Sequence, residues 1–106
     1  MKMKAIAMVA GAALLSLGLA GNAAADQALA TAKGCMACHQ IDTKVVGPAY
    51  KEVAAKYKGD ATAEDKLVTK VLEGGTGVWG QVPMIPNKAT TSPEEARTLV
   101  KWILSL

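Results

Sequence analysis

The residues that most constrain this chain are at positions 35–39, where the sequence reads Cys-Met-Ala-Cys-His. Cys35 and Cys38 are the only cysteines among the 106 residues, and His39 is the only histidine. Residues three and four apart lie on the same face of a helical turn. Both thiols and the imidazole can therefore face one common partner, and any fold of this chain must provide room for it.

Cys-x-x-Cys-His is the sequence to which c-type haem is attached. We expect Cys35 and Cys38 to form thioethers with the two haem vinyl groups, and His39 to supply an axial nitrogen to the iron. A thioredoxin-like redox pair is disfavoured because the chain has no βαβ pattern. A structural zinc site needs four ligands, and a disulfide between Cys35 and Cys38 closes too small a loop to stabilise much. The motif therefore predicts one covalently bound haem c per chain.

Residues 1–25 have the pattern of a cleavable secretory signal peptide. Two lysines precede an apolar run over residues 5–20, and three alanines follow at the expected cleavage site. The alternative, a transmembrane anchor, is disfavoured because a spanning helix needs roughly 20 apolar residues. Without this segment, the domain of residues 26–106 has a formal charge of +1 instead of +3. These features predict a periplasmic domain with no stable membrane insertion after cleavage, and they remove the case for a nucleic-acid partner.

The mature domain is predicted to be all-α, because hydrophobic residues recur at helical spacing and no strand alternation is evident. Four short helices are expected: from about residue 27 towards 35, from Pro48 to Gly59, from Thr62 to Gly74, and from Ser92 onward. The last start is the clearest, since Ser92 and Glu95 form a capping box around a proline at the first helical position. The four helices are expected to wrap around the haem, which would supply a core that 81 residues build only marginally.

Residues 74–91 are too long and too apolar for an ordinary exposed loop. Met84 lies here between two prolines, and after cleavage the only other methionine is Met36, which follows Cys35 on the proximal side. We expect Met84 to be the second axial ligand, although an apolar gap-filling role is the alternative. A His/Met pair leaves no open iron position and predicts reversible one-electron transfer.

Five stretches of the mature chain carry a resemblance to a known family. They are Gly34–His39, Val46–Tyr50, Gly77–Gly80, Pro83–Asn87 and Lys101–Leu104. In these stretches the chain resembles the small class I bacterial monohaem cytochromes c, which donate electrons to periplasmic nitrite reductase or to terminal oxidases. The resemblance implies the class I cytochrome c fold, four short helices around one haem.

The resemblance also implies roles for residues around the haem. Pro48 would accept a hydrogen bond from His39, in line with the general need to orient a ligating imidazole. Asn87 would hold the Met84 sulfur, and Trp79 would donate its indole N–H to a haem propionate. From the residues alone, Asn87 also fits an ordinary turn and Trp79 a core aromatic.

Two residues depart from the family pattern. Lys70 stands where many members carry an arginine that pairs with a propionate, and a lysine lacks the bidentate guanidinium. Ile85 replaces a proline that commonly follows the ligating methionine, a change that loosens the loop around Met84.

The function implied is that of a one-electron carrier, not an enzyme, in respiration or denitrification. Its expected partners are periplasmic or membrane-bound redox proteins: a nitrite reductase, a terminal oxidase and a quinol-oxidising complex. A monomer is expected, with lysines at 33, 44, 51 and 88 available to steer acidic partners. Two alternatives stay open: a five-coordinate haem enzyme or gas and peroxide sensor, and a non-haem exported thiol protein.

Overall fold

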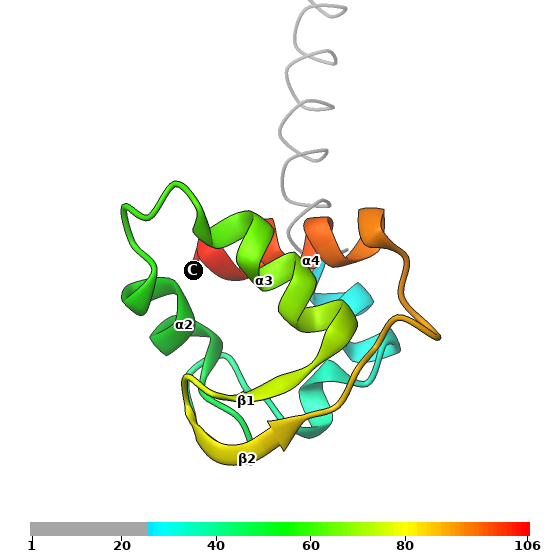
Figure 1. Ribbon diagram of the computed structural model, residues 1–106, viewed down its shortest axis with the longest axis horizontal. Coiled ribbons are helices and arrows are strands. Elements are labelled where there is room, and N and C mark those ends of the chain that lie inside the picture. Colours follow the sequence, from blue (N-terminus) through cyan, green and yellow to red (C-terminus); the bar gives the residue numbers. More distant parts are fainter. Residues whose placement is uncertain (1–25) are drawn as a thin grey trace, which may run out of the picture.

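The computed structural model describes residues 26–106, so the expected signal peptide of residues 1–25 lies outside the described residues. The elements after the helical residues 26–32 are η1 (Cys35–Ala37), α2 (Tyr50–Lys56), α3 (Ala63–Glu73), β1 (Gly75–Gly77), β2 (Gly80–Met84) and α4 (Pro93–Leu104). Among the described residues, no helix is both long and apolar enough to cross a membrane. Figure 1 shows α2 and α3 above the β1–β2 hairpin, with α4 beside α3. The four expected helices are confirmed.

Helix α4 holds the fold together by packing on both α3 and α2. Its stripe Ala96, Leu99, Val100 and Ile103 is buried as the helical spacing predicts. One side of α4 joins a cluster with residues of α2, and the other joins a cluster with Val68 of α3. Because the two clusters share one helix, α2 and α3 are fixed relative to each other.

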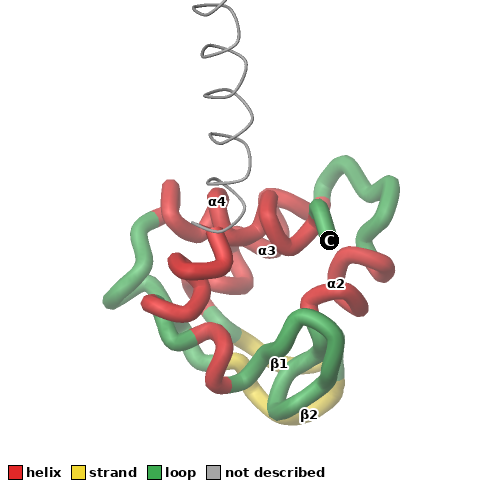
Figure 2. Tube along the Cα trace, turned by 180° about the vertical axis from the view of Figure 1, so that it is seen from behind, coloured by secondary structure: helices red, strands yellow, loops and turns green. Residues whose placement is uncertain are grey.

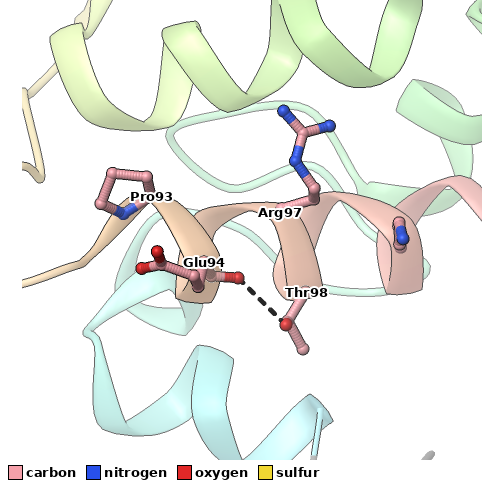
Figure 3. A pocket seen from close by; sticks show the side chains of 5 residues that line it. Pro93, Glu94, Arg97 and Thr98 are labelled. Carbon is pink, nitrogen blue, oxygen red and sulfur yellow. Dashed lines mark hydrogen bonds between the residues drawn. The ribbon is translucent and has the colours of Figure 1, made fainter.

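An ion pair network on α4 reinforces the contact with α3. The Arg97 side chain rises from α4 towards α3 (Figure 3), where it pairs with Glu64 and Asp65. The carboxylates raise the pKa of the Arg97 guanidinium. Since these groups are substantially exposed, the network contributes modestly to stability.

The start of α4 has the capping box that the sequence predicts. The Ser92 hydroxyl accepts from the Glu95 amide at 3.1 Å, and the Glu95 carboxylate accepts from the Ser92 amide at 3.0 Å. The Ser92 amide, with help from Lys33, holds the pKa of the Glu95 carboxyl below its usual range. A lowered pKa in the folded state means that this contribution is present at neutral pH and is lost as the pH falls through it.

We expect Ser92→Ala to lower the free energy of unfolding by about 1 kcal/mol, because the Glu95 amide at the start of α4 loses the hydroxyl that accepts its hydrogen bond. Chemical denaturation of the haem-loaded protein measures this. Thr98→Ala is the matched control, since its exposed hydroxyl only bonds back to the Glu94 carbonyl at 3.1 Å (Figure 3); a change within about 0.5 kcal/mol is expected. Equal losses in the two variants would contradict the capping role.

Two helix ends differ from the sequence prediction. The first helix ends at residue 32 instead of continuing towards 35, because Gly34 adopts a left-handed conformation with φ 78°. At the start of α3, Thr62 makes no side-chain cap. Its amide and hydroxyl instead donate to the Asp60 carboxylate at 2.8 and 2.6 Å, which keeps the pKa of Asp60 low. The turn before α3 is thus stabilised by the Asp60 carboxylate, and the Thr62 side chain does not cap the helix.

The long segment after α3 has structure of its own, which the all-α prediction did not include. Strands β1 and β2 form an antiparallel hairpin in which Gly75 faces Met84 and Gly77 faces Gly80. The strand residues are exposed on both faces up to Met84, so no alternation of hydrophobic and polar residues marks them in the sequence. Figure 2 shows this hairpin with loops on one side of the molecule and α3 and α4 on the other.

Candidate functional site

The Cys-x-x-Cys-His motif occupies a tight turn between the first helix and α2. Cys35 begins the 3-10 turn η1, and its carbonyl accepts from the amides of Cys38 and His39 at 3.2 and 3.0 Å. Cys35 is half-buried and Cys38 is exposed. Burial raises the pKa of the Cys35 thiol, while a hydrogen bond with Tyr50 opposes that shift. The turn brings both sulfurs and the imidazole to one side, as the spacing predicts.

The His39 ring is held by the segment that follows the motif. Its Nδ1 lies 2.8 Å from the carbonyl oxygen of Pro48, the contact that the resemblance implied. The Gly47 amide donates to the Cys38 carbonyl at 2.8 Å, and the Tyr50 amide donates to the Gln40 carbonyl at 2.9 Å. These bonds fold residues 40–50 back over the motif, so that Pro48 reaches the imidazole.

Gly47 stands so close to His39 that no side chain fits between them. A Cβ on Gly47 would lie 2.5 Å from Cε1 of His39, 2.9 Å from Nδ1 and 3.0 Å from Nε2. Real Cβ atoms essentially never approach a ring atom within 3.0 Å. Glycine is therefore required here by the close approach of backbone and ring.

One cavity of about 620 Å³ unites the predicted site residues. Its size falls in the range of roughly 300–1,000 Å³ that is usual for ligand sites, and most of its lining is apolar side chain. All of the site residues predicted from the sequence line it: Cys35, Cys38, His39, Pro48, Lys70, Trp79, Met84 and Asn87. The other walls come from α2, α3, α4 and the hairpin. Two thiols, an imidazole and a thioether around an apolar space fit a haem that is attached at two vinyl groups and ligated on both faces.

Met84 lines this cavity at the end of β2, on a segment that is hydrogen-bonded to α3. The Asn87 amide nitrogen Nδ2 donates to the carbonyls of Val71 at 3.1 Å and Ile85 at 3.0 Å. The Asn87 backbone amide also donates to the Val71 carbonyl. Gly74 lies against the Met84 carbonyl, where a Cβ would collide with it. Both hydrogens of the Asn87 amide group are used in these bonds, and a contact of Asn87 with the Met84 sulfur stays a prediction.

Trp79 and Lys70 approach the cavity from different elements. Trp79 lies in the turn of the hairpin, and the ammonium of Lys56 lies 5.6 Å from the centre of its ring. Lys70 extends from α3 to β1, where a Cβ on Gly75 would lie 2.8 Å from its Nζ. Both line the cavity, and their contacts with propionates stay predictions.

Most of the lysines expected to steer partners are engaged within the chain. Lys33 pairs with Glu95 at 3.2 Å, Lys51 with Asp42 at 2.7 Å and Lys88 with Glu73 at 3.1 Å. Each pair neutralises most of the field that a lone ammonium would present to an acidic partner. The steering expected of these lysines is therefore weaker than the sequence suggests.

A Cys-x-x-Cys-His turn that faces an apolar cavity in a small helical domain defines a c-type haem protein. The comparisons with known proteins agree. A family model described as Cytochrome c matches residues 23–106, so the chain belongs to the cytochrome c family. Cytochrome c-551 of Allochromatium vinosum is 52% identical over 94 residues, which cover 89% of this chain and 99% of the relative.

Solved structures extend this likeness to the fold. Wild-type cytochrome c552 of Nitrosomonas europaea has a TM-score of 0.71 at 48% identity, covering 74% of this chain and 96% of that chain. The class 1 cytochrome MtoD of Sideroxydans lithotrophicus ES-1 has a TM-score of 0.65 at 38% identity, covering 76% and 91%. The chain is thus a small class I monohaem cytochrome c. It binds one covalently attached haem c and is a haem-based electron carrier.

Two residues that shape the site were not assigned to it from the sequence. Gly47 and Tyr50 lie in a stretch that carries the family resemblance, but neither residue is given a role at the haem by that resemblance. Neither residue type marks a haem site by itself. Their contacts with His39 depend on how residues 40–50 fold back, a tertiary feature that no spacing in the sequence reveals.

Proposed function

We propose that this protein is a periplasmic one-electron carrier whose haem is held by Cys35, Cys38, His39 and Met84. The two cysteines form the thioethers, and the His39 and Met84 side chains are the axial ligands of the iron. The observation that carries the proposal is the single cavity onto which all four side chains open. The bound haem supplies the reversible exchange of one electron between ferric and ferrous iron.

The protein's own groups prepare this site. The Pro48 carbonyl accepts a hydrogen bond from the Nδ1–H group of His39 at 2.8 Å, which leaves Nε2 free to bind the iron. The hydrogen bond from Asn87 to α3 and the close contact of Gly74 with the Met84 carbonyl hold the Met84 segment against α3. The Met84 side chain therefore moves little when the iron changes between its ferric and ferrous states. With both axial positions filled, no coordination site is left for oxygen, peroxide or a substrate.

Electrons cross at an exposed apolar edge of the cavity. Val45 and Val46, which follow the motif, are each 50% exposed, and Ile85, next to Met84, is 70% exposed. An apolar edge of this kind suits brief contacts with several redox proteins, here a quinol-oxidising complex as donor and a nitrite reductase or terminal oxidase as acceptor. Residues 1–25 act as a cleaved signal peptide, and residues 26–106 form the mature cytochrome domain, a monomer in the periplasm.

Carbon monoxide tests this function against the five-coordinate alternative. We expect the absorption spectrum of the purified ferrous protein to stay unchanged under carbon monoxide at neutral pH, since both axial positions are filled. The Met84→Ala variant is the positive control and should bind the gas at once. Immediate binding by the unmodified protein would overturn the proposal and favour an enzyme or gas sensor.

A further inference from the structure

The aromatic ring of Tyr50 lies against the imidazole of His39. The ring centroids are 4.9 Å apart and the ring planes differ by 18°, so the two rings are stacked. Tyr50 is the first residue of α2 and is only 4% exposed. A buried tyrosine in this position covers the imidazole with a flat, rigid surface.

Tyr50 is itself held firmly from several sides. Its ring meets that of Trp102 on α4 edge to face, with centroids 5.7 Å apart and planes at 79°. Its backbone amide donates to the Gln40 carbonyl at 2.9 Å. Both rings belong to the cluster that α2 and α4 share, against which Cys35 also packs. The stacking surface is thus fixed to the core of the domain.

The hydrogen bond to Pro48 alone does not define the orientation of the imidazole. It fixes the direction in which Nδ1 points, but the ring plane can still tilt about the line from Nδ1 to the carbonyl oxygen. A parallel aromatic surface removes this freedom, because a tilt would separate the rings or press them together. The close backbone of Gly47 restricts the ring further.

We propose that Tyr50 is a positioning residue that fixes the rotation of the His39 imidazole about its bond to the iron. The inference rests on the proposed function, in which His39 is an axial ligand. Tyr50 acts only through its contact with the His39 ring. Its ring, and not its hydroxyl, performs this role.

Proton NMR of the ferric holoprotein reports this orientation, because the plane of the axial imidazole, together with the orientation of the Met84 thioether, determines how unpaired spin is shared among the four haem methyl groups. We expect Tyr50→Phe to keep the order and spread of the methyl resonances, since the ring is retained. Tyr50→Leu should reorder them or narrow their spread. The matched control is Val68→Ala, which loosens the other side of α4 without lining the cavity and should leave the pattern unchanged.

Two outcomes would overturn the inference: an unchanged pattern in Tyr50→Leu, or the same reordering in Val68→Ala. If Tyr50→Leu yields no holoprotein, nuclear Overhauser contacts between the Tyr50 and His39 rings in the unmodified protein decide the question, and their absence overturns it. A failure of the proposed function looks different. It would appear as a high-spin ferric spectrum of the unmodified protein, before any Tyr50 variant is made.

Discussion

The Gly47→Ala variant is expected to be less stable than the unmodified holoprotein by about 3 kcal/mol, at the upper end of the usual cost of overpacking. The added Cβ would lie 2.5 Å from Cε1 of His39. The ring cannot move aside freely, because Pro48 holds Nδ1 and Tyr50 covers the ring. Either the proposed bond between His39 and the iron or the contacts of His39 with Pro48 and Tyr50 must weaken. Chemical denaturation and the ferric absorption spectrum measure the two consequences, and both should change.

Gly59→Ala is the matched control for this prediction. Gly59 has φ +81° and no atom within 4 Å of the site of a Cβ, so alanine brings backbone strain without a collision. We expect a loss of about 1–2 kcal/mol from the left-handed conformation and an unchanged spectrum. A native-like spectrum and stability in Gly47→Ala would show that the close approach of Gly47 to His39 does not constrain the ligand.

Replacing Met84 by alanine should abolish the sulfur-to-iron charge-transfer band and lower the reduction potential by a few hundred millivolts. A thioether ligand favours ferrous iron and raises the potential, and axial ligands together account for a range of about 0.8 V among haem proteins. In Met84→Ala, water or no ligand takes this position, so ferric iron is favoured. Spectroscopic redox titration of the haem-loaded variant measures the shift.

Met36→Ala provides the comparison, because Met36 is the only other methionine in residues 26–106. Met36 is half-buried and packs against the cluster of α2 and α4. Its loss should reduce stability through packing, yet leave the charge-transfer band and the potential in place. Retention of the band in Met84→Ala would rule out Met84 as the ligand, whatever happens in Met36→Ala.

Local chemistry explains why much of this site could be predicted from the sequence. The Cys35–His39 motif needs only one turn of chain to present its three groups. Ser92 and Glu95 cap a helix from three residues apart. Met84 could be selected because, within residues 26–106, the only other methionine is Met36 in the Cys-x-x-Cys-His motif itself. In each case the residues that act together are close in sequence or are alone of their kind.

The features that could not be predicted depend on distant contacts. The β1–β2 hairpin has no alternating pattern, since its strands are exposed on both sides. At the start of α3, the Thr62 hydroxyl donates to the Asp60 carboxylate instead of accepting from an amide of the helix, and the sequence alone does not rank these two local hydrogen bonds. The positions of Gly47 and Tyr50 against His39 follow from the bonds that fold residues 40–50 back over the motif.

These distant contacts give the start of α2 a dual role. Pro48 lies just before the helix and Tyr50 is its first residue, so one short segment supplies both the hydrogen bond and the stacking surface for His39. Because α2 packs on α4, the orientation of the imidazole is tied to the core of the domain. On the other side of the cavity, the hydrogen bond from Asn87 to the Val71 carbonyl holds the Met84 segment against α3 in the same way.

In the proposed site, His39 and Met84 hold the iron between these two supported segments. Proton NMR of the ferrous holoprotein, with the methionine methyl groups isotopically labelled, tests whether Met84 is a ligand. We expect the Met84 methyl resonance to be displaced far upfield by the ring current of the haem, while the Met36 resonance lies much closer to its ordinary position. A Met84 methyl resonance at the ordinary position of a free methionine would contradict ligation by Met84.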